Sequence, residues 1–104
     1  MILKKQNKIL NIGTIVYLKS NNKKTNLYQY SGEIEEINSS LIYILEKFKP
    51  FGFVSCHKSY IVNIEYLYKF NGKKCIFKNN ETIPIGRKYY KNFKEELFNL
   101  NLKI

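Results

Sequence analysis

The stretch "EYLYKFNGKKCIFKNNETIPI", residues 65–85, decides the class of fold. It holds three short runs with the composition of strands, "EYLYKF", "KKCIFK" and "ETIPI". Asn71-Gly72 separates the first two runs and is a strong hairpin signal, because both residues tolerate the positive φ angles of tight turns. "KNNE" at 78–81 predicts a second turn. Short strands joined by tight turns predict a mostly antiparallel β architecture.

The preceding segments repeat this pattern. "FGFVSCHKSYIVN" (51–63) has strand composition, and "LYQYSGEIEEI" (27–37) alternates in part. The latter predicts two strands that meet in a short turn near Ser31-Gly32. "KSNNKKTN" (19–26) is polar and basic, and it predicts a loop.

The first expected strand lies in "ILNIGTIVYLKS" (9–20), which is rich in β-branched residues and broken at a glycine. Side chains alternate between the two faces of a strand. We therefore expect Ile15 and Tyr17 on one face and Val16 and Leu18 on the other.

Two segments change to helical periodicity. In "NSSLIYILEKF" (38–48), Leu41, Leu45 and Phe48 recur at helical spacing, and Pro50 ends the run. After Lys88, a second apolar stripe is formed by Tyr90, Phe93, Leu97 and Leu100. The residues thus predict roughly seven to ten short strands and two short helices.

The composition restricts the partner. The chain has 104 residues, which predicts one domain spanning 1–104, and a net charge of +10 with a pI near 9.6. Such a charge favours a polyanion, either nucleic acid or an acidic membrane surface. The abundance of Lys, Asn and Ile also suggests an AT-rich genome, which raises the lysine content whatever the function. No apolar run approaches the roughly 18 residues of a membrane span, and the N-terminus lacks a signal peptide, so we expect a cytoplasmic protein without membrane insertion.

Several kinds of chemistry are excluded by residue type. The chain has no Asp and one His, so we expect no phospho-accepting aspartate, no multi-His metal site and no cofactor. Cys56 and Cys75 predict two reduced, half-buried thiols. Cys56 precedes His57, but neighbours on a strand face opposite ways and cannot form a nucleophile–base pair. We therefore expect a protein that is not an enzyme.

Three features keep two interpretations open. The basic segment 19–26 is a solvated turn or a DNA-facing loop. His57 is a structural histidine or a contact to phosphate or base. Arg87, the only arginine beside seventeen lysines, pairs with a carboxylate near the helix start or lies exposed at the end of a strand. In the second case its planar guanidinium forms a fork that matches guanine O6 and N7, and lysine cannot reproduce this fork.

The motifs "FVSCHKSYIVN" and "IPIGRKYY" give a more specific signal. With the segments around them, over roughly residues 8–98, they resemble the LytTR family of bacterial DNA-binding domains. The resemblance implies a mainly β, LytTR-type domain of about ten short, mostly antiparallel strands in small sheets, with short helices near 39–48 and 88–99. It also implies that loops and strand ends, rather than a recognition helix, enter the major grooves of double-stranded DNA.

The resemblance implies a transcription regulator that binds direct-repeat sites, with a second copy of itself as partner on tandem half-sites. Family members usually carry a receiver domain with a phospho-accepting aspartate, which this Asp-free sequence lacks. We therefore expect the output domain of a two-component response regulator or a free-standing regulator. The alternatives are a non-specific basic protein that binds RNA or single strands, and a protein-binding module whose charge reflects genome composition.

The resemblance carries over to particular positions. Lys24, Lys58 and Arg87 match DNA-contact positions of the family. His57 and Ser59 lie within the first motif and are expected to serve the DNA backbone or the local geometry. Many members have arginine where this chain has Ser55 and Lys58, so we expect weaker affinity for phosphate at that edge. Four further candidates flank the matched positions: Asn22, Lys23, Lys88 and Tyr89.

Overall fold

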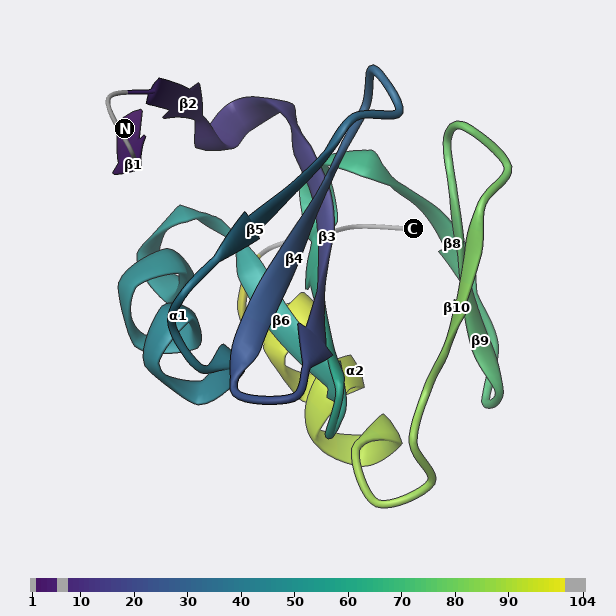
Figure 1. The fold of residues 1–104 in the computed structure, drawn as a ribbon. Coiled ribbons are helices and arrows are strands. Elements are labelled where there is room, and N and C mark those ends of the chain that lie inside the picture. Colours follow the sequence, from purple (N-terminus) through teal and green to yellow (C-terminus); the bar gives the residue numbers. More distant parts are fainter. Residues whose placement is uncertain (1, 6–7, 101–104) are drawn as a thin grey trace.

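The computed structural model describes residues 2–5 and 8–100, and Figure 1 shows their arrangement. The expected domain of residues 1–104 therefore ends in four residues that lie outside the described part. The strands are β1 (Ile2–Lys5), β2 (Lys8–Asn11), β3 (Ile15–Asn21), β4 (Lys24–Gln29), β5 (Ile34–Ile37), β6 (Phe53–His57), β7 (Tyr60–Asn63), β8 (Leu67–Phe70), β9 (Lys74–Phe77) and β10 (Thr82–Pro84). The helices are α1 (Leu41–Phe48) and α2 (Tyr90–Asn99), and short 3-10 turns are η1 (Ile12–Thr14), η2 (Lys49–Phe51) and η3 (Ile64–Tyr66).

The strands of the described residues form three antiparallel sheets. A five-stranded sheet has the order β5-β4-β3-β7-β6, a three-stranded sheet the order β10-β9-β8, and β1 pairs with β2. This confirms the predicted mainly β fold with short antiparallel strands. The predicted hairpins near Ser31-Gly32 and at Asn71-Gly72 are present, as is the turn at 78–81.

The five-stranded sheet is the middle layer of the molecule. On one face its side chains pack against α1, where Ile44 and Phe48 are buried. On the other face they pack against the three-stranded sheet and α2, through residues such as Phe77 and Phe93. Figure 1 shows α1 on one side of this sheet and β8–β10 on the other. Burial on both faces explains why "IVYL" is an unbroken apolar run.

An aromatic stack joins the two larger sheets. Tyr17 of β3 stacks on Tyr28 of β4, with ring centroids 4.4 Å apart, and on Phe77 of β9 at 5.4 Å. Burial, followed by the nearby Glu81 carboxylate, raises the pKa of Tyr17 well above its ordinary range. The phenol therefore stays neutral even in alkaline solution where a free tyrosine ionises, and the stack joins the two sheets through uncharged rings.

The expected faces of the first strand are wrong. Ile15 and Leu18 face α1, whereas Val16 and Tyr17 face the three-stranded sheet. The register between β3 and β4 shifts between Ile15 and Tyr17, which marks a β-bulge or a similar irregularity. An extra residue in one strand interrupts the alternation of side chains, and no local composition signal announced it.

The segment 19–26 is also not a loop. β3 continues to Asn21, β4 begins at Lys24, and these two residues pair across the turn. Thr25 is fully buried, and its hydroxyl donates to Ser39 O at 2.8 Å. The segment is polar because most of its side chains face solvent, and its composition therefore did not indicate strands. Only Asn22 and Lys23 form the turn.

Both helices are where the periodicity placed them, with shorter bounds. Phe93 and Leu97 of α2 are buried and Tyr90 is half-buried, as the apolar stripe predicts. Leu100 follows the helix end and is 44% exposed, so it is not part of the buried face. Among the described residues, no helix is long and apolar enough to cross a membrane.

The cysteines are more deeply buried than expected. Cys56 and Cys75 are both free thiols with no exposed surface, in the core between the two larger sheets. Cys56 Sγ donates to Pro84 O at 3.7 Å. Its hydrogen bond with Cys75, together with burial, raises the pKa of the Cys56 thiol far above its ordinary value. A thiol in this state is a poor nucleophile.

Candidate nucleic-acid interface

The β3–β4 turn carries the first group of expected contact residues. Asn22 and Lys23 form its tip, and Asn22 has a φ of 59°. Asparagine tolerates this left-handed conformation better than most residues, which explains its presence in a two-residue hairpin loop. Asn22, Lys23 and Lys24 are all exposed.

Lys24 is held by an acidic neighbour that sequence reasoning did not identify. Its Nζ lies 3.4 Å from Oε1 of Glu36 on β5, and Asn21 Nδ2 donates to Glu36 Oε2 at 3.1 Å. Because Lys24 and Glu36 are about half exposed, this pair contributes little to folding stability. Glu36 instead places a negative charge beside an expected DNA contact.

The β6–β7 turn brings in the second group. Lys58 and Ser59 join the paired residues His57 and Tyr60. Ser59 N donates to His57 Nδ1 at 3.0 Å, so the imidazole closes the turn. Lys58 is exposed at the tip of the turn, and the expected roles of His57 and Ser59 toward the DNA backbone or the local geometry stay predictions.

This second turn lies beside the first. Ser20 N, near the end of β3, donates to Ser59 O at 2.9 Å. One position earlier, Lys19 pairs with Tyr60, and its Nζ lies 5.7 Å from the Tyr60 ring centroid. Lys19 therefore joins the basic surface. The prediction of a loop over 19–26 did not place Lys19 here, because its position depends on the two-residue hairpin between β3 and β4.

The connection between β10 and α2 supplies the third group. Gly86 N donates to Cys56 O at 2.8 Å, and Tyr89 N donates to Gly86 O at 2.9 Å. A side chain at Gly86 would crowd the site, because an added Cβ would lie 3.1 Å from Tyr89 Cδ1 and 3.5 Å from His57 Cδ2. Glycine thus lets this turn sit against the β6–β7 turn.

Arg87 and Lys88 form the exposed tip of this third turn, and Tyr89 is half-buried before α2 begins. Among the described residues, Arg87 has no carboxylate partner, so the alternative of an ion pair at the helix start is wrong for this part of the chain. No hydrogen bond or ion pair within the described part of the chain occupies its guanidinium donors.

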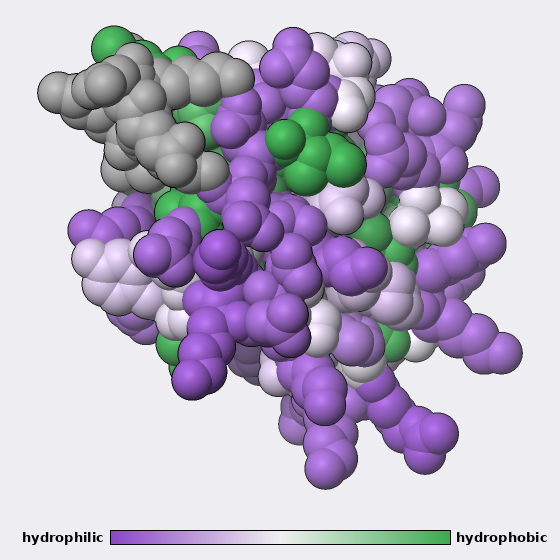
Figure 2. Space-filling model, viewed as in Figure 1, coloured by the Kyte–Doolittle hydropathy of each residue, from purple (hydrophilic) through white to green (hydrophobic). Residues whose placement is uncertain are grey.

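The three turns share one edge of the molecule. They lie at the lower edge in Figure 1, and hydrophilic side chains project from the same edge in Figure 2. Together they bring most of the expected residues into one surface, which we call the basic edge. Its cations are Lys19, Lys23, Lys24, Lys58, Arg87 and Lys88. Glu36 is the carboxylate that the contacts place among them. Such a surface suits a polyanion.

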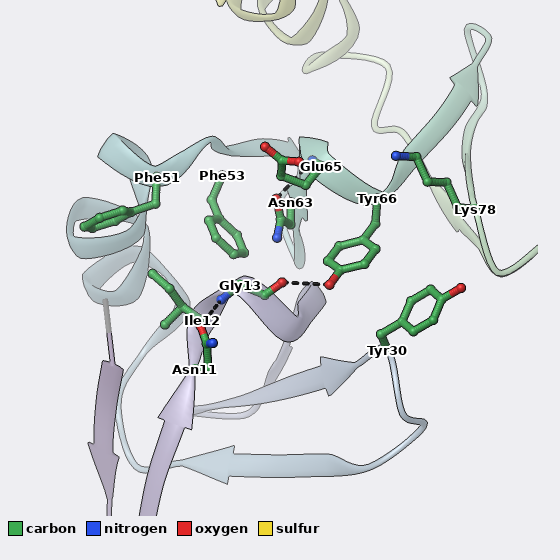
Figure 3. Close-up of a pocket in the computed structure, with 10 residues that line it drawn as sticks. All are labelled: Asn11, Ile12, Gly13, Tyr30, Phe51, Phe53, Asn63, Glu65, Tyr66 and Lys78. Carbon is green, nitrogen blue, oxygen red and sulfur yellow. Dashed lines mark hydrogen bonds between the residues drawn. The ribbon is translucent and has the colours of Figure 1, made fainter.

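A separate cleft lies at the other end of the strands. Its volume is about 560 Å³, and it is lined by residues that include Tyr30, Tyr66 and Asn63 (Figure 3). Tyr66 donates to Gly13 O at 2.7 Å, and Asn63 Nδ2 donates to Ile15 O at 2.8 Å. These polar groups are occupied by the fold, and the described residues contain no cluster of three His, Cys or Glu that could hold a metal.

These observations define the class of structure: a mainly β domain whose basic edge is made of turns. The family model of the LytTr DNA-binding domain matches residues 5–98. The chain therefore belongs to the LytTR family of DNA-binding domains, which are output domains of transcription regulators. The polyanionic partner that the net charge predicts is accordingly DNA.

A solved structure supports the fold. It is the LytTr DNA-binding domain of a protein described as a methyl-accepting/DNA response regulator from Bacillus cereus. The two chains are 21% identical, with a TM-score of 0.74, over 93% of this chain and 94% of that one. No curated protein matches the chain.

We expect replacement of Glu36 to strengthen DNA binding. Glu36→Gln removes the carboxylate that repels phosphate and releases Lys24. One repulsion near the surface is on the order of 1 kcal/mol, so affinity for duplex DNA should rise about threefold to tenfold at low salt. Fluorescence anisotropy can measure this, with Glu65→Gln in the distant cleft as the charge-matched control. Weaker binding by Glu36→Gln would show instead that Glu36 holds Lys24 in its binding position.

Asn22 can be tested for its two roles separately. We expect Asn22→Ala to lower the free energy of unfolding by about 1–2 kcal/mol, because alanine is strained at positive φ, whereas Asn22→Gly should keep stability. Urea denaturation distinguishes the two variants, and equal stabilities would contradict the structural role. If Asn22 also contacts a base, the stable glycine variant will still lose DNA affinity.

Proposed function

We propose that this domain binds specific double-stranded DNA sequences and acts as a bacterial transcription regulator in the cytoplasm. The single observation that carries the proposal is the gathering of three turns, with an exposed arginine and five lysines, on one edge. Narrow turns fit a major groove about 12 Å wide without a recognition helix. We further propose that a second copy binds the neighbouring half-site of a direct repeat.

Each turn has a distinct part in this proposal. The lysines neutralise phosphates, which gives affinity that falls with salt. Arg87 reads guanine through its planar fork, and Lys24 and Lys58 contact the DNA from the two neighbouring turns. His57 and Ser59 fix the geometry of the central turn. Asn22, Lys23, Lys88 and Tyr89 shape or extend the contacts at each side.

The placement of aromatic side chains argues against the alternative of single-strand binding. Proteins that bind single strands stack bases on exposed aromatic rings. Here the exposed rings lie on other parts of the described chain: Tyr30 and Phe51 at the distant cleft, Tyr43 on α1, Tyr68 on β8 and Phe98 on α2. At the basic edge, by contrast, Tyr60 and Tyr89 are half-buried.

A competition experiment tests the proposal. A labelled duplex is displaced by unlabelled duplex DNA, single-stranded DNA or RNA of equal length, at low and at physiological salt. We expect duplex DNA to compete best, and log affinity to fall with log salt by about 0.9 per phosphate contact. Stronger competition by a single strand would overturn the proposal in favour of the non-specific alternative.

A further inference from the structure

A fourth turn adjoins the basic edge and takes no part in the site described above. This is the β8–β9 turn, with Asn71 and Gly72 at its tip and Lys73 and Lys74 after them. Ile85 N donates to Lys73 O at 2.8 Å, and Pro84 pairs with Lys74. In Figure 1 this turn points to the same lower side as the β10–α2 connection. This backbone hydrogen bond holds Lys73 beside Ile85, which precedes Arg87 by two residues.

The β8–β9 turn is ordered by its own contacts. Asn71 Oδ1 accepts from Lys73 N at 2.8 Å and from Lys74 N at 3.0 Å. Asn71 N in turn donates to Lys74 O at 3.1 Å. Because these bonds occupy the backbone donors of both lysines, a ligand at this turn is contacted by their side chains.

Both lysine side chains are available to a ligand. Lys73 and Lys74 are exposed, and neither has a carboxylate partner among the described residues. Cys75, the next residue along β9, points into the core, so Lys74 projects from the outer face of the three-stranded sheet. A lysine ammonium is a point charge that suits phosphate, and it lacks the rigid planar fork with which arginine reads a base.

We propose that Lys73 and Lys74 bind the DNA phosphate backbone just outside the segment contacted by Arg87. The inference rests on the proposed function and extends its footprint to one flank. The contact is independent of sequence, so it adds affinity and salt dependence without changing base preference. Each phosphate contact contributes about fivefold in affinity at 0.15 M salt, from the release of counterions.

The test compares Lys73→Gln/Lys74→Gln with a control that loses the same charge elsewhere. Lys47→Gln/Lys49→Gln is suitable, because these exposed lysines lie at the end of α1 that leads to Phe51 and the distant cleft. Binding is measured over a range of salt on a duplex with long flanks and on duplexes trimmed at one end or the other. Circular dichroism checks that both variants fold.

On the long duplex we expect the β8–β9 variant to lose about 5- to 30-fold in affinity and up to about 1.8 in salt slope relative to the control. Trimming one particular flank should abolish this difference. Equal behaviour of variant and control on the long duplex, or a loss that survives both trims, would overturn the inference. A failure of the proposed function gives a different result, because the wild-type protein would then bind duplexes of different sequence with equal affinity.

Discussion

Arg87→Ala is expected to lose about 1–3 kcal/mol of binding free energy at a specific DNA site, or roughly 5- to 150-fold in affinity. The guanidinium is exposed at the tip of the third turn, and no carboxylate among the described residues competes for it. A bidentate contact to guanine discriminates against other bases, so the variant should also become indifferent to the base at one position. Anisotropy on the preferred duplex and on the three duplexes that differ from it at that position measures both effects.

Arg87→Lys is the matched control for charge. It keeps the attraction to phosphate but lacks the planar fork. We expect it to bind random duplex DNA like the wild type while losing the same base preference as Arg87→Ala. If Arg87→Ala weakens binding to specific and random DNA equally, Arg87 acts only as a charge and the account of base reading is wrong.

Phe93→Ala is expected to have the largest effect on stability, lowering the free energy of unfolding by about 3–5 kcal/mol. Phe93 has no exposed surface, and its ring meets Phe70 edge-on with centroids 5.3 Å apart. Its N–H also donates to Tyr89 O at 2.8 Å, directly after the turn that carries Arg87. The side chain therefore anchors both α2 and the third turn of the basic edge.

Phe98→Ala provides an internal control on the same helix. Phe98 is 70% exposed, so the same deletion of a ring should change stability by no more than about 0.5 kcal/mol. Urea denaturation of both variants gives the comparison. Similar losses for the two would contradict the packing of α2 against β6 and the three-stranded sheet.

Local signals in the sequence predicted much of the fold. Asn71-Gly72 and "KNNE" marked turns correctly, because the residues that tolerate tight turns are few. The stripe of Phe93 and Leu97 predicted α2, because a helix that covers a core needs this spacing. These features depend on residues close together along the chain.

Features that depend on distant residues could not be predicted in the same way. The irregular register at Ile15–Tyr17 is defined by the pairing of β3 with β4 and reverses two side chains. The pair between Lys24 and Glu36 arises because β5 lies beside β4. The strand residues on either side of Asn22 are all polar, so the sequence there shows no alternation of apolar and polar side chains.

The candidate site shows the same division. Arg87 stood out as the only arginine, and the two motifs marked His57, Lys58 and Ser59. Lys19 lies in the basic segment 19–26 but did not stand out within it, and Lys73 did not stand out from the other lysines, because their positions beside the turns follow from backbone pairing across strands. Selection of the relevant lysines therefore required the fold.

The central claim is that the basic edge reads sequence through Arg87, and a binding selection from a random duplex pool tests it most directly. Wild type and Arg87→Lys are selected in parallel and the retained DNA is sequenced. We predict that wild type enriches paired short motifs about one helical turn apart, roughly 10–10.5 base pairs. Arg87→Lys should lose a guanine within them. Retained DNA without any enriched motif would contradict the claim and leave a surface that binds DNA by charge alone.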